Sequence, residues 1–193
     1  MAEHHEAILD RFREAGALLE GHFLLSSGRH SPVYLQGALV LQHPDLAEDL
    51  CGRLARPFAD EGVETVLAPA IGGIVAAHEV ARALGARAVF AERVAGRMTL
   101  RRGFGLGQGE RVLLLEDVVT TGGSLREVQR LAREAGAEVV AVAALVDRTG
   151  GADAGFGMPL TALARLEAPT YDPEDCPQCR QGLPLVKPGS REF

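Results

Sequence analysis

The chain lacks the features that would place it in a membrane or make it a disulfide-stabilised secreted protein. It has 193 residues, and none of its uncharged runs reaches the ~20 apolar residues that span a bilayer. Its three cysteines, Cys51, Cys176 and Cys179, cannot form a disulfide framework. The first residues, Met-Ala-Glu-His-His-Glu, are acidic and polar, unlike a secretory signal. We therefore expect a soluble, cytoplasmic protein.

Positive charge is also scarce, and almost none of it is lysine. The formal net charge is −6, and Lys187 is the only lysine. An acidic chain is a poor general binder of nucleic acid, because contact with many phosphates needs a broad basic face. One segment differs, since four arginines and no carboxylate lie between Arg93 and Arg102. Such a basic segment indicates a small anionic ligand, with a solvated turn as the alternative.

Cys176-Pro-Gln-Cys179 has the spacing of metal sites and of redox motifs. No second pair completes a four-ligand zinc site in the sequence. A thioredoxin-like motif should open a helix after a strand, whereas this pair lies in a proline-rich tail. The spacing leaves a structural role, an incidental pair and metal binding open.

Apolar periodicity predicts a chain in which helices and strands alternate. Helices are expected at 4–19, 44–61, 73–84 and 123–134. Strands are expected at 22–25, 32–41, 65–68, 88–91, 111–115 and 138–146, with an irregular tail from Pro169 onward. Strands separated by helices of this length imply an α/β fold with a parallel sheet. The later strands lack alternation, which is typical of strands buried on both faces.

The sharpest motif follows the strand expected at 111–115. Two acids, Glu116 and Asp117, precede the loop Thr120-Thr121-Gly122-Gly123-Ser124, which leads into a helix. Glycines let backbone N–H groups converge and the helix N-terminus adds partial positive charge, so the loop suits a phosphate monoester. The acids suit a diol or a hydrated cation. Phosphate beside a diol describes ribose 5-phosphate, and a plain helix cap is the alternative.

Two other nucleotide motifs are excluded. A P-loop would need Gly-x-x-x-x-Gly-Lys-Ser/Thr, and this loop contains no lysine. A dinucleotide fingerprint should follow a strand, whereas Gly103-Phe-Gly105-Leu-Gly107 precedes one.

Residues 115–124 resemble the phosphoribosyl-diphosphate signature of type I phosphoribosyltransferases. Three further segments make the chain similar to orotate phosphoribosyltransferases in particular: an early substrate loop at 27–34, a diphosphate-binding turn at 69–74, and the stretch 146–148 that ends in Arg148. The ending 187–191 is also similar to bacterial members. The chain is thus identified as a member of this family.

The resemblance implies the type I phosphoribosyltransferase fold, with a central, mainly parallel sheet flanked by helices. A single domain over 1–193 would comprise an N-terminal hood (roughly 1–40), a core (41–166) and an irregular tail (167–193). The implied reaction transfers ribose 5-phosphate from 5-phosphoribosyl 1-diphosphate to N1 of orotate, giving orotidine 5′-phosphate and diphosphate for pyrimidine synthesis. Mg²⁺ is the implied cofactor. The implied assembly is a homodimer whose basic loop, 93–105, acts in the neighbouring site, with no nucleic-acid or membrane partner.

The resemblance also implies a role for each matching residue. Arg97 and Asp117 are the expected catalytic residues. The expected contacts of phosphoribosyl diphosphate are Arg93, Arg97, Ile71, Gly72, Gly73, Glu116, Asp117, Val118, Val119, Thr120, Thr121, Gly122, Gly123 and Ser124. The expected contacts of orotate are Thr120, Arg148, Tyr34 and Leu35. No side chain is expected to ligate a metal directly, since Mg²⁺ would be held near Glu116 and Asp117 mainly by substrate and water.

The chain departs from the enteric-type members of the family. Their basic loop reads Arg-Lys-x-x-Lys-x-His, whereas residues 93–99 read Arg-Val-Ala-Gly-Arg-Met-Thr. Residues that stand where those members carry lysine are Ser26, Gly72, Val94 and Arg97. Because arginine stays protonated, Arg97 can stabilise a leaving diphosphate but cannot donate a proton to it. Arg101 and Arg102 can supply further charge, and Lys187 is the one lysine that could replace those missing.

Two other functions remain as alternatives. A purine phosphoribosyltransferase would use the same 116–124 loop, but a neutral purine needs no cation such as Arg148, and 149–151 offer no aromatic ring. A regulator that senses phosphoribosyl diphosphate and binds nucleic acid would need a basic surface or a winged helix. For single residues, the alternatives are an ion pair of Arg148 near Asp147 and an ordinary strand at 31–35.

Overall fold

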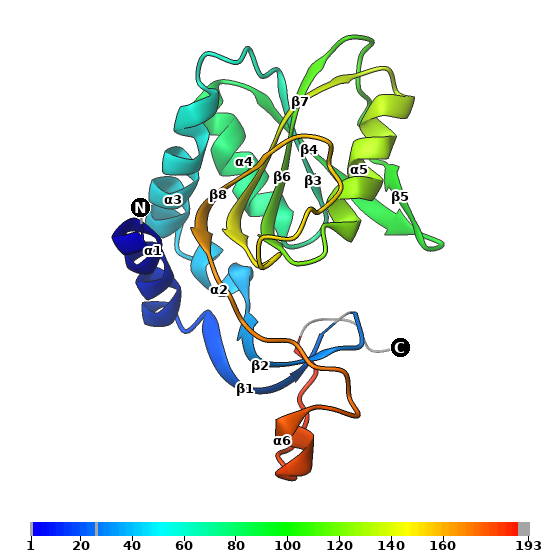
Figure 1. Ribbon diagram of the computed structural model, residues 1–193. Coiled ribbons are helices and arrows are strands. Elements are labelled where there is room, and N and C mark those ends of the chain that lie inside the picture. Colours follow the sequence, from blue (N-terminus) through cyan, green and yellow to red (C-terminus); the bar gives the residue numbers. More distant parts are fainter. Residues whose placement is uncertain (1, 26, 189–193) are drawn as a thin grey trace.

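The computed structural model describes residues 2–25 and 27–188 (Figure 1). Ser26 and residues 189–191, on which two of the expectations above fall, lie outside the described residues. A two-stranded sheet is formed by β1 (Leu18–Leu24) and β2 (His30–Leu35). A six-stranded sheet has the order β5-β4-β3-β6-β7-β8. Its strands are β3 (Thr65–Pro69), β4 (Arg87–Val94), β5 (Arg97–Leu100), β6 (Arg111–Val119), β7 (Glu138–Asp147) and β8 (Leu160–Arg165).

Helices cover both faces of the larger sheet. They are α1 (Ala2–Glu14), α2 (Gly37–Leu41), α3 (Pro44–Ala55), α4 (Gly73–Leu84), α5 (Gly123–Glu134) and α6 (Pro177–Arg180), with a 3-10 turn η1 (Arg56–Phe58). α1, α3 and α4 lie on one side of the sheet and α5 on the other (Figure 1). Within the described residues, no helix is long and apolar enough to cross a bilayer.

The core explains why the strands of the larger sheet lack alternation. Val66 and Leu113 pack in the cluster under α1, α3 and α4, whereas their neighbours Leu67 and Leu114 pack in the cluster under α5. All four side chains are fully buried, so apolar residues are needed on both faces. Every pairing in this sheet is parallel except β4 with β5. The predicted α/β fold with a mainly parallel sheet is confirmed.

Two helices were predicted to the residue, and most errors lie at the ends of elements. α4 and α5 have their predicted bounds. β6 runs to Val119, four residues beyond the prediction, because it stays paired with β7 as far as Asp147. Glu116 and Asp117 are therefore strand residues, and the loop after them is short.

Other elements were predicted wrongly or missed. Residues 37–41 form α2 rather than the second half of a strand. α1 ends at Glu14, because Leu18 and Leu19 pair with β2 instead of continuing the helix. α3 ends at Ala55 and η1 follows it. β5 and β8 were not predicted, since both are short and lie at the two edges of the sheet.

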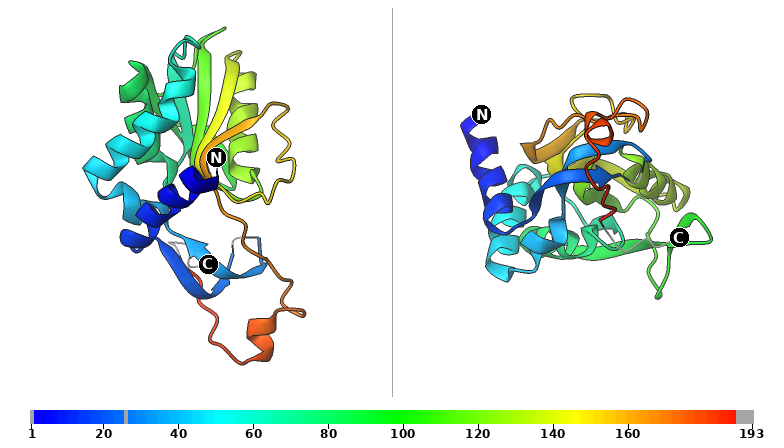
Figure 2. Two further views of the ribbon diagram at one scale, coloured as in Figure 1. Left: turned by 60° about the vertical axis from the view of Figure 1, so that its left-hand side comes forward. Right: turned by 90° about the horizontal axis from the view of Figure 1, so that it is seen from below.

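The β1–β2 hairpin and the tail lie together and face the carboxyl ends of the parallel strands (Figures 1 and 2). The tail is irregular, as predicted, apart from the single turn of α6 and isolated bridges to the hairpin. It brings Cys176 and Cys179 beside His22 and His30 of the hairpin. The sequence left the role of this cysteine pair open, and the histidines beside it lie more than 140 residues away in the chain.

Candidate active site

Asp117 lies where three segments converge at the carboxyl end of the larger sheet. A Cβ atom added to Gly37, at the start of α2, would contact its carboxylate, and one added to Gly72 would lie 2.9 Å from both carboxylate oxygens. The space beside Gly72 is thus taken by the Asp117 side chain. The sequence analysis did not identify Gly37 as a residue of the site. The only signal in the sequence was the presence of a glycine inside an apolar run, which can mark a close approach of the backbone to another group.

Glu116 and Asp117 form an acidic pair without a cationic partner. Burial, reinforced by the charge of Asp117, raises the pKa of Glu116 to about 8. Burial also raises the pKa of Asp117, although backbone N–H groups of Val118 and of Asp117 itself act against it. No ion pair within the described residues neutralises either carboxylate. Both side chains are half-buried, so they are enclosed but open to a ligand. Such a pair marks a candidate functional site.

The loop between β6 and α5 has the form of a phosphate cradle. Gly122 has φ 72°, and a Cβ there would lie 2.8 Å from the ring of Phe156, so glycine is required. No side chain caps α5, which leaves the backbone N–H groups of its first turn available to an anion. Arg126 fixes the loop from outside, donating to the carbonyl oxygens of Thr121 at 2.7 Å and Ala154 at 2.5 Å. Thr120 and Thr121 are exposed, and Ser124 is half-buried.

Arg148 follows β7 and reaches the hood. Its Nη2 lies 3.3 Å from both Ser31 Oγ and the carbonyl oxygen of Val33, while its buried Nε has no hydrogen-bond partner among the described residues. Burial lowers the pKa of Arg148, and the neighbouring Tyr34 acts in the opposite direction. The pKa of Tyr34 is raised by burial and then by the charge of Asp117, whereas Arg148 lowers it. The ring of Tyr34 therefore lies near both Asp117 and Arg148.

The structure bears on the alternative for Arg148 and on the position of Leu35. Arg148 makes no ion pair near Asp147, because Asp147 pairs with Arg165 at 3.6 Å and accepts a hydrogen bond from the backbone N–H of Thr149. Leu35 was expected to contact orotate, but its side chain is 5% exposed and packs in the core. Only its backbone can face the site.

The basic segment is a β-hairpin rather than an open loop. β4 and β5 pair as far as Val94 and Arg97, around a turn at Ala95 and Gly96 with positive φ. Arg93 is held by Glu127 of α5 at 2.7 Å. Arg97 is exposed and forms no side-chain hydrogen bond or ion pair within the described residues. Neither arginine is joined by such a bond to the residues around Asp117.

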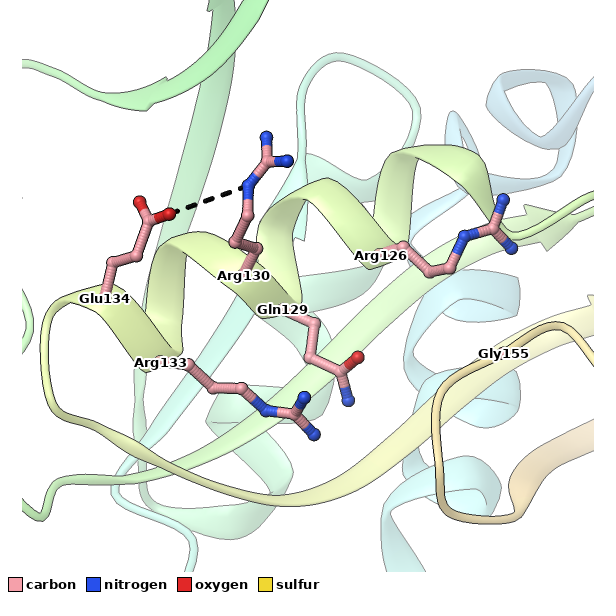
Figure 3. A pocket seen from close by; sticks show the side chains of 6 residues that line it. All are labelled: Arg126, Gln129, Arg130, Arg133, Glu134 and Gly155. Atoms are coloured by element: carbon pink, nitrogen blue, oxygen red, sulfur yellow. Dashed lines mark ion pairs between the residues drawn. The ribbon is translucent and has the colours of Figure 1, made fainter.

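A separate surface hollow runs along the outer side of α5 (Figure 3). It is lined by Arg126, Gln129, Arg130, Arg133, Glu134 and Gly155. These side chains come almost entirely from one helix, and Arg130 is engaged by Glu134 at 3.7 Å. The hollow contains none of the residues expected to bind substrate, so it is not the candidate active site.

Known proteins share both the fold and the sequence of this chain. Residues 40–154 match the model of the phosphoribosyl transferase domain. Orotate phosphoribosyltransferases from Pelotomaculum thermopropionicum and Caldicellulosiruptor bescii are 55% and 53% identical over 188 and 187 residues, which cover 97% of this chain and 98% of each relative. The crystal structure of orotate phosphoribosyltransferase from Aeropyrum pernix matches with a TM-score of 0.68 at 28% identity, covering 82% of this chain and 93% of that one.

The parallel sheet, the acidic pair and the phosphate cradle, together with the matched domain, define a type I phosphoribosyltransferase. A shared fold alone would not select the base. The chain shares more than 50% of its residues with orotate phosphoribosyltransferases over nearly its whole length, and this identity selects orotate as the base. The chain belongs to the orotate phosphoribosyltransferase family.

Proposed function

We propose that this chain transfers ribose 5-phosphate from 5-phosphoribosyl 1-diphosphate to N1 of orotate, giving orotidine 5′-phosphate and diphosphate. The observation that carries the proposal is the meeting of two opposite chemistries at one end of the sheet. An acidic pair without a cation, Glu116 and Asp117, lies on one side. An arginine with an unpartnered buried nitrogen, Arg148, lies on the other. A sugar diol and an anionic base satisfy both.

The sugar would be held by β6 and the loop that follows it. Glu116 and Asp117 would accept hydrogen bonds from the 2′- and 3′-hydroxyls. The 5′-phosphate would lie in the cradle at 120–124, against the first turn of α5. The diphosphate would meet the turn at 71–73, where Ile71 is 76% exposed and the backbone is accessible. The site would thus bind the substrate through three of its groups, which positions C1 for attack.

The base would be selected by Arg148 and the hood. Its Nε can donate a charge-assisted hydrogen bond to the carboxylate of orotate. A neutral purine would leave this nitrogen unpaired in a buried position, and an unpaired buried donor is unfavourable. Ser31 and Val33 would line the same site, since each has an oxygen atom 3.3 Å from Arg148 Nη2, and Tyr34 follows Val33 on the same strand.

The acidic pair also fits a magnesium ion. Mg²⁺ prefers oxygen ligands and keeps several of its waters, and the two carboxylates are half-buried without a protein cation. When bound, the ion would offset the charge of the diphosphate. Glu116 and Asp117 would hold it mainly through water and the ribose hydroxyls.

The leaving diphosphate would be stabilised by Arg97, delivered from the partner subunit of a homodimer. Support comes from the β4–β5 hairpin, where Arg97 is exposed and forms no ion pair within the described chain, while the nearby Arg93 is already held by Glu127. A fixed positive charge at the leaving group would act by electrostatic stabilisation.

The free thiols of the chain also fit the reducing cytoplasm as its compartment.

An absorbance assay tests the reaction directly. The purified chain is mixed with phosphoribosyl diphosphate, Mg²⁺ and orotate, and the loss of orotate absorbance is followed. Turnover with orotate and none with adenine, hypoxanthine or xanthine is expected. Turnover with a purine but not with orotate would overturn the base assignment. If the chain instead binds DNA only in the presence of phosphoribosyl diphosphate and shows no turnover, it is a regulator.

Subunit mixing tests the shared site. Arg97→Ala and Asp117→Asn chains are each expected to be nearly inactive alone. If Arg97 acts in the neighbouring site, mixed dimers regain one intact site, and about a quarter of the wild-type activity returns on statistical mixing of two-fold dimers. An unchanged, inactive mixture that contains mixed dimers would show that Arg97 acts within its own subunit.

A further inference from the structure

Four side chains with metal-binding chemistry meet away from the candidate active site. They are His22 of β1, His30 at the start of β2, and Cys176 and Cys179 at the two ends of the turn that forms α6. One ligand atom of each, an imidazole nitrogen or a thiol sulfur, lies within 4.8 Å of all the others. More than 140 residues separate the histidines from the cysteines in the chain, so only the packing of the tail against the hairpin brings them together (Figure 1).

The spacing of these atoms is close to that of a tetrahedral site. His22 Nε2 lies 2.9 Å from His30 Nδ1, 3.5 Å from Cys176 Sγ and 3.6 Å from Cys179 Sγ. Cys179 Sγ lies 3.3 Å from His30 Nδ1. Tetrahedral zinc with ordinary bond lengths would set nitrogens about 3.3 Å apart and nitrogen and sulfur about 3.6 Å apart. Every measured distance is within a few tenths of an ångström of these values.

The hydrogen bonding of His22 prepares its lone pair for a metal. Nδ1 of His22 lies 3.0 Å from the carbonyl oxygen of Leu183. A carbonyl can only accept, so Nδ1 carries the hydrogen and neutral His22 has its lone pair on Nε2, which faces the other three ligands. A backbone carbonyl that fixes the tautomer of a metal-binding histidine in this way is the usual outer-shell arrangement.

Backbone hydrogen bonds from the tail hold both histidines in place. The carbonyl oxygen of His22 accepts from the N–H of Val186, and the N–H and carbonyl of His30 pair with Tyr171. Gln178, between the cysteines, donates to the carbonyl oxygen of Gly21 at 2.7 Å. β1 is also irregular between Glu20 and Phe23, and such bulges re-aim side chains. The four ligands therefore come from two segments that are hydrogen-bonded to each other.

The tail has almost no apolar core to hold it. Of residues 167–188, only Cys176 is buried, at 0% exposure, while Leu183, Leu185 and Val186 are all 44–50% exposed. A buried cysteine that faces two histidines is therefore the centre of this interface. Small structures that lack a core are commonly stabilised by a metal.

We propose that His22, His30, Cys176 and Cys179 bind one Zn²⁺ ion as a closed, four-ligand structural site. Two imidazoles and two thiolates in a tetrahedron favour zinc over the oxygen-seeking ions. Each thiol would lose its proton to the solvent as its sulfur–zinc bond forms, and zinc undergoes no redox change. With four protein ligands no position is left for a substrate, so the site would be structural. It differs from the Mg²⁺ site both in place and in ligand chemistry.

The zinc would join the tail to the strand that forms the base pocket. His30 directly precedes Ser31, and Ser31 Oγ is one of the two acceptors of Arg148. A metal at His30 would therefore restrain the part of β2 that faces the base. The proposal itself needs only the metal and the tail, and its test does not depend on catalysis.

Metal analysis of the full-length, tag-free protein is the primary experiment. We expect one zinc per chain by mass spectrometry, and loss of that zinc in Cys179→Ser and in Cys176→Ser. Cys51→Ala is the matched control, because Cys51 is a buried residue of α3, outside the cluster, and this variant should keep its zinc. Cys179 is exposed, so its replacement should leave the fold intact, which circular dichroism checks.

Cobalt substitution and proteolysis give two readouts independent of the variants. Metal-stripped wild-type protein should bind one Co²⁺ and develop the visible bands of tetrahedral cobalt with thiolate charge transfer. Stripping should also expose the tail to trypsin at Arg180, with cleavage faster by about tenfold or more, because local opening controls proteolysis. Protein grown with added zinc that contains none and shows no cobalt–thiolate band would refute the site. Zinc retained in both serine variants, or a Cys176–Cys179 disulfide in the purified protein, would refute it equally.

Discussion

Arg148→Met is the change that tests the base pocket most directly. Methionine keeps much of the volume of the side chain and removes its charge and all its donors. In the free enzyme little is lost, because the two bonds of Nη2 are long, at 3.3 Å, and Nε has no partner. The unfolding free energy is expected to change by less than about 1 kcal/mol, since a buried cation without a carboxylate partner contributes little to stability.

With orotate bound, the same change should be large. Nε and the guanidinium charge would meet the carboxylate of the base, and a charge-assisted hydrogen bond to a buried anion is worth about 1.5–3 kcal/mol. We therefore expect kcat/KM for orotate to fall by about 10- to 150-fold. The KM for phosphoribosyl diphosphate should change far less. Initial rates from orotate absorbance, measured with each substrate varied in turn, separate the two effects.

Arg165→Met is the matched control. Arg165 is also an arginine at the end of a strand, but it is 65% exposed and pairs with Asp147 rather than facing the pocket. Its loss should alter kcat/KM for orotate by less than about twofold, because the Arg165 guanidinium is exposed and its contact with the buried Asp147 is long, at 3.6 Å. The assignment of Arg148 would be refuted by a loss below fivefold, or by an equal loss for both substrates.

Three further changes test the rest of the site. Glu116→Gln should weaken a pH dependence. The raised pKa of Glu116 means that the folded protein holds a proton which the unfolded chain has lost, so wild-type stability without ligand should fall as pH rises from about 4.5 to about 8. Melting curves of the variant should show a smaller slope, which Asp117, whose pKa is also raised, retains in part. Gly72→Ala would place a Cβ 2.9 Å from the Asp117 carboxylate and so displace this group. The KM for phosphoribosyl diphosphate should therefore rise about tenfold or more in steady-state assays. An unchanged KM would show that Asp117 can move freely. Arg97→Ala should lower kcat by about 10² in the orotate assay, and a near-normal rate would exclude its role.

Much of the fold was predictable because local pattern and tertiary packing agree. α4 and α5 were predicted to the residue, since each begins at a glycine-rich loop and has the apolar spacing of a surface helix. Residues 37–41 were not, because their apolar run fits a strand as well as a helix. In the folded chain this segment starts at Gly37, which packs against Asp117, a residue eighty positions away.

The candidate site divides in the same way. The acidic pair and phosphate cradle at 116–124 are contiguous, so their chemistry could be inferred from the sequence. The partners of Arg148 could not be inferred from the sequence, because Ser31 and Val33 reach this side chain only through the folded hood. Nor could the β4–β5 hairpin, since the turn at Ala95–Gly96 carries no signal strong enough to separate a strand pair from an open loop.

The α/β class, the phosphate cradle and the family resemblance could be inferred from the linear chain, because each depends on residues that are neighbours in it. Which distant groups meet depends on the packing of the folded chain. It placed Asp117 against Gly72, Arg148 against the hood, and two histidines of the first thirty residues against two cysteines of the tail. Such contacts depend on how strands and loops pack in space, and spacing along the chain carries no record of that packing.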